Sequence, residues 1–434
     1  MVETYLYEQN LHWQNKLFNA GTERELLPGL MSLMKVDHIL AISGVRRCGK
    51  SYLMKQLINR LVESGVAPQN ILFVNLELPA LVGRPAAEVL DKVWNTFQKI
   101  NDPQGRVYLF LDEIQTLPAW EVWMKYNYDL QKGMIKFVIT GSNSRLLSSE
   151  FATLLSGRVI EKRLFPFSLR ERLLQIGIEY SDPQVRVLQK NKILREFENM
   201  VYEGGMPELF DIKDKERKRE IVSSYFDTIV YKDIVPRFSV RQSGLLKDLA
   251  VYLTGQAASL INLKRLADLF SSNRNSIKEF LSYLNYSLLL SLVEKYDFSP
   301  VKREKALKKV YLVDNAFAAF VPLRFSPDRG IFLGNFVSIE LLRVQDRVFY
   351  WKNQEECDFI VTENGAPRQA IQVCFELNEK NRDREIAGLL AANRGLKTKE
   401  HVILTFAQTN KMQAKGIDIK VIPVYQWLLE DSKD

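Results

Sequence analysis

The residues most able to do chemistry lie in a glycine-rich loop at 44–51, with the spacing Gly-x-x-x-x-Gly-Lys-Ser. An apolar run precedes this loop and an amphipathic helical pattern follows it, which is the context of a phosphate-binding loop. Glycines let backbone N–H groups close around phosphate oxygens, and the helix N-terminus adds positive potential. Lys50 is expected to reach the β- and γ-phosphates of ATP, and Ser51 to ligate Mg²⁺. The expected nucleotide contacts in this loop are Gly44, Arg47, Cys48, Gly49, Lys50, Ser51 and Tyr52.

A second apolar run, VYLFLDE at 107–113, ends in two carboxylates. Asp112 is expected to hold Mg²⁺ through water at the cofactor site, and Glu113 to orient or deprotonate the attacking water. An isolated Asp-Glu pair at a strand end would be read as a solvated turn. Because this pair follows a phosphate-binding loop in the same chain, the catalytic interpretation is favoured.

A third apolar run, IKFVITG at 135–141, is followed by Ser142 and Asn143. A polar side chain at this place can sense the γ-phosphate and align the water. Asn143 is therefore a candidate catalytic residue, and Ser142 a candidate nucleotide contact. The same residues could instead cap the helix that the next residues predict, and one residue could do both.

Arg158 stands just before another strand-like run. In ring-forming ATPases an arginine at this place reaches the γ-phosphate bound by a neighbouring subunit, and activity then depends on a homo-oligomer. The other interpretation is a surface salt bridge. The sequence leaves both open.

These candidate residues need a scaffold that brings strand ends together. Five apolar runs alternate with helical patterns over the first part of the chain. This alternation predicts an α/β fold with a parallel, doubly wound sheet of the P-loop NTPase type. The predicted strands lie near 38–43, 71–76, 107–112, 135–141 and 159–164.

The run from LFLDEIQTLPAW through GSNSRLL to LSGRVIEKRLF resembles the AAA-type ATP-binding proteins of bacteria and archaea that carry a C-terminal domain related to the PD-(D/E)XK restriction-nuclease fold. Segments at 202–210 (YEGGMPELF), 225–238 and 308–320 (KKVYLVDNAFAAF) are similar to later parts of the same family. The expected parts are an N-terminal helical segment (1–35), an AAA-type ATPase core (36–165), a helical lid (166–240), a winged-helix-like module (241–300) and a nuclease-like domain (301–434).

Residues 245–297 have helix-turn-helix spacing, with a wing expected after Leu292. On a DNA-binding interpretation, double-stranded DNA would be contacted through 262–290. The alternative is a winged-helix module that packs against protein. The residues expected to face the groove are Asn273, Arg274, Asn275 and Lys278, and those expected to meet phosphates are Lys264, Arg265 and the run VKREKALKK.

The last part resembles a nuclease domain that has lost its chemistry. An active site of this kind pairs two carboxylates on Mg²⁺ with a lysine that activates water. Asp358 matches the first acid, but Gln372 and Cys374 stand where the second acid and the lysine belong. Glu376 is out of register. The fold is expected without cleavage, and Glu340 and Asp358 would be structural or a remnant metal site; the family's Glu-Asn pair is replaced by Gly334-Asn335.

The composition is that of an ordinary globular chain: 434 residues, 46% hydrophobic, 26% charged and a net charge of +8. The three cysteines form no CxxC pair, which points to a reducing compartment. No signal peptide or membrane span is visible, so a cytoplasmic protein is expected. The favoured function is Mg²⁺-dependent ATP hydrolysis coupled to movement of the attached modules. The alternative is a nucleotide-controlled binding switch for a protein or nucleic acid, with little turnover.

Overall fold

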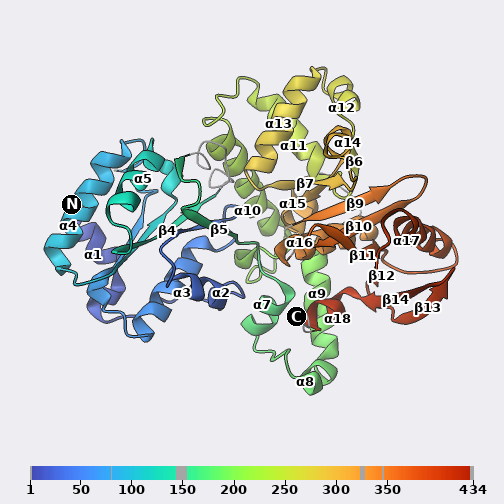
Figure 1. Ribbon diagram of the computed structural model, residues 1–434, viewed down its shortest axis with the longest axis horizontal. Coiled ribbons are helices and arrows are strands. Elements are labelled where there is room, and N and C mark those ends of the chain that lie inside the picture. Colours follow the sequence, from blue (N-terminus) through green and yellow to red (C-terminus); the bar gives the residue numbers. More distant parts are fainter. Residues whose placement is uncertain (1, 80, 143–153, 323–327, 345–346, 431–434) are drawn as a thin grey trace. The chain divides into compact units, whose positions relative to one another are not determined.

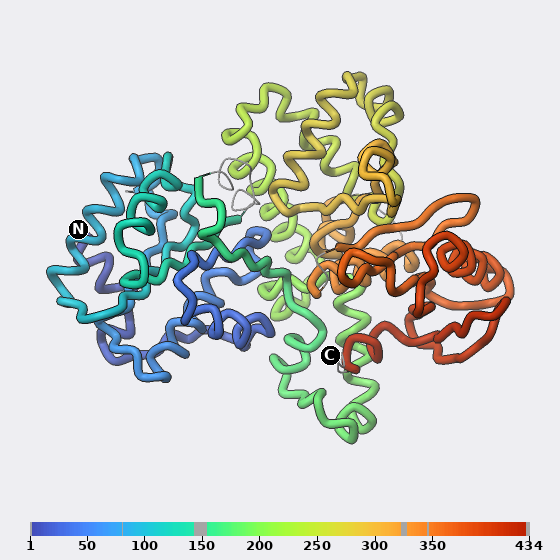
Figure 2. The backbone as a smooth tube through the Cα atoms, viewed as in Figure 1, coloured from blue at the N-terminus to red at the C-terminus, as the bar shows by residue number. Residues whose placement is uncertain are grey.

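The computed structural model describes residues 2–79, 81–142, 154–322, 328–344 and 347–430. The chain divides into two compact units, Met1–Leu164 and Phe165–Asp434. Figure 2 shows each unit as one continuous stretch of the chain, blue to teal for the first and green to red for the second. Each unit is described below by itself.

The first unit contains a five-stranded sheet in which every pairing is parallel. Its order is β2-β3-β4-β1-β5. The first strand, β1, is therefore an inner strand, with β4 on one side of it and β5 on the other. The five strands predicted from the sequence are confirmed. They are β1 (Ile39–Ser43), β2 (Ile71–Asn75), β3 (Val107–Asp112), β4 (Ile135–Gly141) and β5 (Val159–Arg163).

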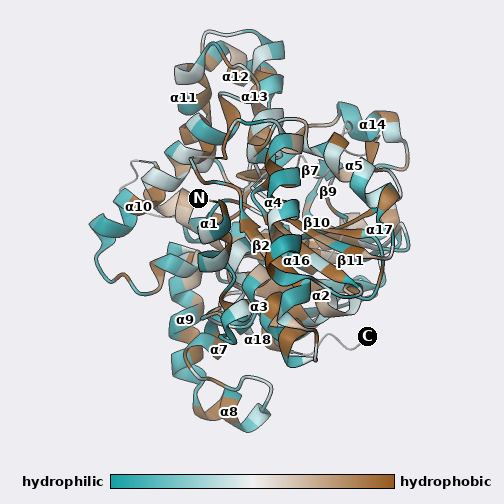
Figure 3. Ribbon diagram, turned by 90° about the vertical axis from the view of Figure 1, so that its left-hand side faces the viewer, coloured by the Kyte–Doolittle hydropathy of each residue, from teal (hydrophilic) through white to brown (hydrophobic). Residues whose placement is uncertain are grey.

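Helices α3 (Lys50–Glu63), α4 (Ala86–Asn101) and α5 (Trp120–Leu130) connect these strands. In α4 the buried residues recur at helical spacing and form part of the core under the sheet. Figure 3 shows the opposite, outward face of α4 as largely hydrophilic. Because all strands run the same way, β1, β3 and β4 end at one edge of the sheet.

The N-terminal segment contains α1 (Val2–Gln9) and α2 (Leu27–Leu33), and its residues 5–13 cover the open edge of the sheet at β2, while α2 packs against α3. The Asn10 side chain donates to the Phe73 carbonyl and accepts from the Phe73 N–H, at 2.9 and 2.7 Å. Tyr5 donates to the Asn75 carbonyl. Side chains thus satisfy backbone groups that an edge strand otherwise leaves unpaired.

The second unit begins with the helices predicted over 166–240. A capping box at Ser168 and Glu171 starts the first helix. The role of these helices as a lid over a nucleotide stays a prediction. They are α7 (Leu169–Gln175), α8 (Pro183–Leu188), α9 (Lys190–Glu203), α10 (Lys215–Thr228) and the π-helix η6 (Ile229–Ile234).

The predicted order of helix, turn and helix over 245–297 is present. Asn273 accepts a hydrogen bond from the Ser276 N–H and caps the second helix. Its side-chain oxygen is therefore engaged in the cap, while the residue is exposed and its role as a groove-facing residue stays a prediction. The elements are α11 (Ser243–Thr254), β6 (Leu260–Ile261), α12 (Leu263–Leu269), α13 (Arg274–Tyr286), β7 (Leu290–Lys295), α14 (Pro300–Lys305) and β8 (Lys308–Leu312).

A nine-stranded sheet runs through the second unit in the order β13-β14-β12-β11-β10-β9-β7-β8-β6. The predicted division at residue 300 falls inside the connection between β7 and β8, which pair antiparallel. β8 was expected to enter the last domain, but its partners are β6 and β7. The remaining strands are β9 (Val348–Lys352), β10 (Glu356–Glu363), β11 (Ala366–Val373), β12 (Glu400–Thr405), β13 (Asn410–Ala414) and β14 (Ile417–Pro423).

Further helices of the second unit are labelled in Figure 1. Within the described ranges, no helix of either unit is long and apolar enough to cross a membrane. These further helices are α15 (Asn315–Phe320), α16 (Arg329–Val344), α17 (Arg382–Leu396) and α18 (Val424–Leu429).

Two segments of the family resemblance meet at a buried carboxylate. Asp314 accepts from the N–H groups of Gly205 and Ala316, at 2.7 and 2.8 Å. Burial nevertheless raises the pKa of Asp314 to about 7. A Cβ on Gly204 would lie 1.9 Å from the Asp314 carboxylate, and φ at Gly204 is +89°. The Gly-Gly pair is therefore a packing requirement of this unit.

Candidate nucleotide-binding site

The loop between β1 and α3 has the compact geometry that its glycines predict. A Cβ on Gly44 would lie 2.5 Å from the Leu164 carbonyl oxygen, so a larger residue does not fit there. Gly49 has φ +103° directly before the first residue of α3. Arg47 also takes a left-handed conformation, with φ 69°. The start of a long helix faces the loop, as a phosphate site requires.

Lys50 is the first residue of α3 and is 4% exposed. Its ammonium lies 3.1 Å from the Glu113 carboxylate and donates to the Gly44 carbonyl. Burial alone would lower the pKa of Lys50, but the negative field of Glu113 and Asp112 raises it overall. The ammonium is therefore charged and sits at the carboxyl edge of the sheet.

Asp112 and Glu113 end β3 at the same edge, and both are buried. Thr140 at the end of β4 donates to Asp112 Oδ1 at 2.5 Å and accepts from the Glu113 N–H at 2.9 Å. Burial and then repulsion by Glu113 raise the pKa of Asp112, while hydrogen bonds from Ser51 and Thr140 oppose the rise. Ser51 and Asp112, the two predicted magnesium ligands, thus lie together.

The second oxygen of Asp112, Oδ2, is buried and has no hydrogen-bonding partner among the described residues. Buried carboxylate oxygens are costly without a partner. Carboxylate and hydroxyl oxygens are ligands that Mg²⁺ prefers. The donor set of Ser51 and Asp112 therefore fits a magnesium ion brought in with a nucleotide.

Glu113 has φ 56° and opens a short turn, η3 (Ile114–Thr116). Burial would raise its pKa, but Lys50 and a hydrogen bond from Gln115 lower it below the usual value. Gln115 Nε2 donates to Glu113 Oε2 at 2.5 Å and to Ser142 Oγ at 3.2 Å. The carboxylate is therefore ionised, as a general base must be.

Sequence reasoning missed Gln115, Thr140 and Arg24. Arg24, 2% exposed, donates to the Cys48 carbonyl of the loop at 2.8 Å. Gln56 of α3 holds the same N-terminal stretch through the carbonyls of Ala20 and Thr22. A buried arginine distant in sequence from the loop carries no local motif, whereas Gln115 and Thr140 lie within two residues of predicted positions.

Four of the predicted site residues have separate outcomes. The Cys48 side chain is buried, and burial raises the pKa of its thiol, so a contact would come from the backbone. Tyr52 is exposed, and its ring lies 3.7 Å from where a Cβ on Gly21 would stand. Asn143 lies outside the described residues, while Ser142 is buried at the end of β4.

Arg158 forms an ion pair with Asp129 of α5, with Nε 2.9 Å from Oδ1. This ion pair is the surface salt bridge that the sequence analysis gave as one of two interpretations of Arg158. The Arg158 carbonyl accepts from the N–H of Ile39, the first residue of β1. Arg158 therefore lies about 16 Å, five residues of strand, from the phosphate-binding end. It cannot reach the nucleotide site of its own chain.

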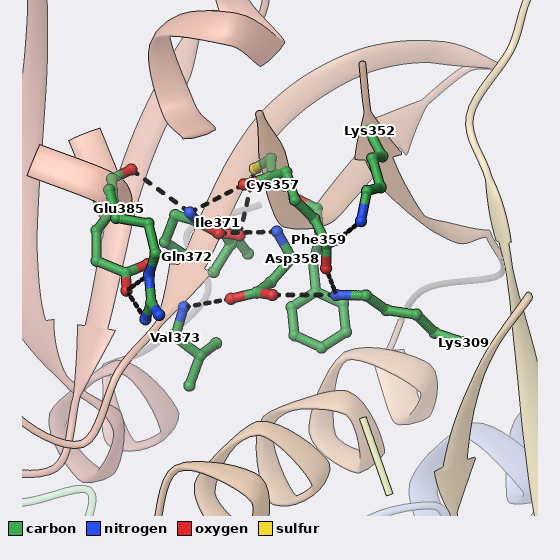
Figure 4. Close-up of polar contacts among 11 residues, drawn as sticks. Lys309, Lys352, Cys357, Asp358, Phe359, Ile371, Gln372, Val373 and Glu385 are labelled. Carbon is green, nitrogen blue, oxygen red and sulfur yellow. Dashed lines mark hydrogen bonds and ion pairs between the residues drawn. The ribbon is translucent and has the colours of Figure 1, made fainter. Parts of the chain in front are cut away.

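The second unit holds another lysine between carboxylates, shown in Figure 4. Lys309 of β8 lies 2.6 Å from Glu356 and 3.1 Å from Asp358. The lysine side chain is 3% exposed. Asp358 also accepts from the Val373 N–H. Asp358, the predicted first acid of a nuclease site, is thus neutralised from inside the protein.

The other predicted nuclease positions carry hydrogen bonds and packing. Gln372 accepts from the Asp358 N–H at 2.8 Å and donates to the Glu356 carbonyl. Burial raises the pKa of Cys374 to about 12, so its thiol stays neutral. Glu376 is exposed, and Glu340 pairs with Arg343. Among the residues that the structure describes, no three acidic, cysteine or histidine side chains are grouped to hold a metal.

Asn335 also has a structural role. Its side chain accepts from the Leu312 N–H and donates to the Leu312 carbonyl oxygen and to the side-chain Oδ1 of Asn315. Gly334, its neighbour on α16, approaches Ala258. The pair Gly334-Asn335 departs from the family's Glu-Asn pattern, and Asn335 forms a buried polar contact between α16 and β8.

Comparison with known families matches an AAA domain over residues 36–173 and a domain of unknown function, DUF8612, over 194–329. The first match agrees with the predicted ATPase core. The second spans most of the predicted lid, the winged-helix part and residues 301–329 of the predicted nuclease-like domain, and its description names no nuclease.

Two solved structures are similar in part. The Aeropyrum pernix ORC1 protein in complex with DNA is 15% identical, with coverage of 69% of this chain and 91% of that chain and a TM-score of 0.31. AMPPCP-bound DnaA from Aquifex aeolicus is 16% identical, with coverage of 63% and 90% and a TM-score of 0.26. Such low scores carry no argument about what this chain binds.

Whole-chain relatives are closer. An uncharacterized protein of Methanocaldococcus jannaschii, MJ1544, is 29% identical over 95% of this chain and 91% of its own length. An uncharacterized protein of Haemophilus influenzae is 30% identical over 93% of this chain and 97% of its own length. The chain therefore belongs to the family of this Haemophilus influenzae protein, and its residues 36–173 match an AAA domain.

Proposed function

We propose that the first unit hydrolyses ATP with Mg²⁺ and that hydrolysis drives movement of the attached modules. The observation that supports this most is the meeting of Lys50, Ser51, Asp112 and Glu113 at one edge of the sheet, with a buried Asp112 oxygen that lacks a protein partner. A phosphate chain and a cation supply the charges that this arrangement accommodates.

The residues divide the chemistry among them. The loop backbone and the start of α3 bind phosphate oxygens, and Lys50 contributes positive charge. Mg²⁺, held by Ser51 and through water by Asp112, supplies charge neutralisation when bound. Glu113 accepts a proton from the attacking water, for which its lowered pKa keeps it ionised.

The second candidate is a binding switch with little turnover. It uses the same loop and the same Mg²⁺ ligands, and ATP sets the affinity for a protein or nucleic acid. The ionised Glu113 beside Lys50 favours the enzyme, because a switch has no need of a base.

We also propose that Arg158 acts on the site of a neighbouring copy. Its distance from the loop of its own chain excludes a role there, and the ion pair with Asp129 is partly exposed. An incoming phosphate would compete with Asp129 for the guanidinium.

The α11–β8 region is proposed to be a winged-helix module that binds double-stranded DNA. Its helices are followed by the pair β7 and β8, with α14 as the wing. Six exposed cations there form no ion pair with any residue in the described ranges, which leaves them available for phosphates. They are Lys264, Arg265, Arg274, Lys278, Lys302 and Lys305.

The last domain is proposed to keep a nuclease-like fold without cleavage. A helix, three antiparallel strands, a helix and a parallel strand follow one another from α16 to β12. Lys309 supplies the positive charge that a divalent cation would bring to Asp358.

Lys50→Ala should abolish ATP binding, because the loop loses its buried ammonium. Glu113→Gln should bind ATP with near wild-type affinity and hydrolyse it about 100-fold more slowly, because the base is lost. Calorimetric titration and phosphate release measure the two properties. Wild-type turnover by Glu113→Gln would remove Glu113 as the base, and tight binding without any turnover in the wild type would favour the switch.

Arg158→Ala and Lys50→Ala should each be inactive alone and should regain activity when mixed. The Lys50→Ala subunit then supplies its arginine to the intact site of the other subunit. Arg84→Ala, which removes an exposed arginine of the same unit, serves as the control and should keep wild-type activity. A mixture no more active than its components would leave Arg158 as a salt bridge only.

Lys309→Met should lower the free energy of unfolding by about 3 kcal/mol, because two carboxylates lose their buried partner. Lys308→Met removes the neighbouring lysine, whose side chain is 27% exposed, and should cost under about 1 kcal/mol. Urea denaturation measures both.

The wild-type protein should not cut DNA in the presence of Mg²⁺. Cutting that Asp358→Ala abolishes would contradict the proposal that the nuclease-like domain is inactive.

Arg274→Ala with Lys278→Ala should weaken DNA binding and reduce the salt dependence by about one ion per lost phosphate contact. Fluorescence anisotropy with duplex DNA over a salt series measures this. Lys411→Ala, a lysine on the distant strand β13, is the control. An unchanged salt slope would direct the search to a protein partner.

A further inference from the structure

The helix α5 of the first unit has apolar side chains on two different faces. Its inner face, which includes two buried tryptophans, belongs to the core under the sheet. Its outer face carries Val122, Tyr126 and Leu130, whose side chains are 60%, 66% and 62% exposed. A helix that is apolar on both sides is normally covered on both sides. In the described parts of the chain, only the inner face of α5 is covered.

The three exposed residues form one ridge. They follow one another at intervals of four residues, so they stand in a row along the outside of the helix. Met134, in the turn after α5, is also exposed. The outward face of the neighbouring helix α4 is hydrophilic (Figure 3), so the ridge is not a general property of this surface. Contiguous exposed apolar side chains of this kind mark an interaction surface.

The charges beside the ridge indicate what covers it. Lys125 and Asp129 lie one helical turn apart on the same flank of the ridge. Lys125 forms no ion pair with any residue that the structure describes, and Asp129 pairs with Arg158. A surface with a negative charge opposite Lys125 and a positive charge opposite Asp129 would be complementary to this flank. The same flank of a second copy, turned end over end, has this order of charges.

The spacing of the ridge is also complementary to itself. Ridges of residues four apart are those by which packed helices most often interdigitate. When two copies of a helix pack antiparallel about a two-fold axis, each residue meets the one that lies equally far on the other side of the axis. With Tyr126 on the axis, Val122 of each copy meets Leu130 of the other.

We propose that α5 forms a two-fold interface with α5 of a second copy of this chain. Val122, Tyr126 and Leu130 supply its apolar centre, and Lys125 of each copy pairs with Asp129 of the other. An interface of this kind closes with two copies, whereas a ring requires head-to-tail contacts.

The antiparallel arrangement gives the interface a role in the nucleotide site. α5 runs from the carboxyl edge of the sheet, after β3, to the amino edge, before β4. Arg158 lies at the amino edge beside Asp129. Reversing the second helix brings the amino edge of one sheet to the side of the carboxyl edge of the other, where the nucleotide loop lies. Lys125 of the second copy also competes with Arg158 for Asp129. This step rests on the proposed action of Arg158 on a neighbouring copy; the interface itself does not.

Disulfide formation between copies tests the symmetry of the interface. Tyr126→Cys should form a linked dimer on mild oxidation, because the axis brings the two copies of this residue together. Val122→Cys and Leu130→Cys should each stay unlinked alone and should link to each other when mixed. The three natural cysteines are buried, so they do not compete. Tyr7→Cys, at a comparably exposed tyrosine of α1, is the control and should stay unlinked.

Sedimentation measures the association without any added cysteine. The wild-type chain should sediment as a dimer at micromolar concentration. Tyr126→Glu should sediment as a monomer, because two carboxylates would meet on the axis out of water. Tyr7→Glu is the matched control and should remain a dimer. An unchanged circular dichroism spectrum reports that Tyr126→Glu is folded.

These measurements do not require ATP turnover, so they separate the interface from the proposed function. A monomeric wild type, or a dimer that Tyr126→Glu leaves intact, would overturn the interface. Linked Tyr126→Cys dimers without rescue in the mixture of Arg158→Ala and Lys50→Ala would keep the interface and remove the action of Arg158 on the other copy. Rescue without linkage of Tyr126→Cys would overturn the interface and assign Arg158 to another surface.

Discussion

The burial of three charges at the end of one sheet is the constraint on which the first unit depends. Taking Lys50, Asp112 and Glu113 out of water costs several kcal/mol for each ion. The charges of the lysine and the glutamate compensate each other. The Thr140 hydroxyl donates to the Asp112 carboxylate and accepts from the Glu113 backbone N–H. Asp112 remains incompletely compensated, with a raised pKa and one oxygen without a partner. The site is therefore organised around charges that a ligand brings.

The second unit also contains a buried lysine beside two carboxylates, but there the charges are balanced within the protein. Lys309, like Lys50, is a nearly fully buried lysine beside two acids. It extends from a strand that is hydrogen-bonded on both sides, and each acid near it has an additional donor. Nothing in this cluster requires a further cation. A buried lysine indicates a ligand site when a neighbouring polar atom lacks a hydrogen-bonding partner, and a structural role when all its neighbours are paired.

Local sequence was sufficient for elements whose signal is contiguous. The five strands and the loop at 44–51 were predicted because apolar runs, glycines and strand ends are read directly from neighbouring residues. Arg24 and Lys309 were not predicted, because each acts on residues far away in the chain and a lone charged residue has no periodic pattern. The pairing of β8 with β6 and β7 was missed for the same reason. Antiparallel partners separated by a helix leave little trace in sequence, so this pairing could not be predicted.

The cover over β2 has a consequence for how the chain can be divided. The family match begins at residue 36, but Tyr5, Asn10 and Trp13 hydrogen-bond the backbone of β2 and pack on the same core. A fragment cut at residue 36 would carry an open strand edge, ready to pair with the same edge of another molecule and to aggregate. The segment matched as an AAA domain and the segment that folds as one unit therefore begin at different residues.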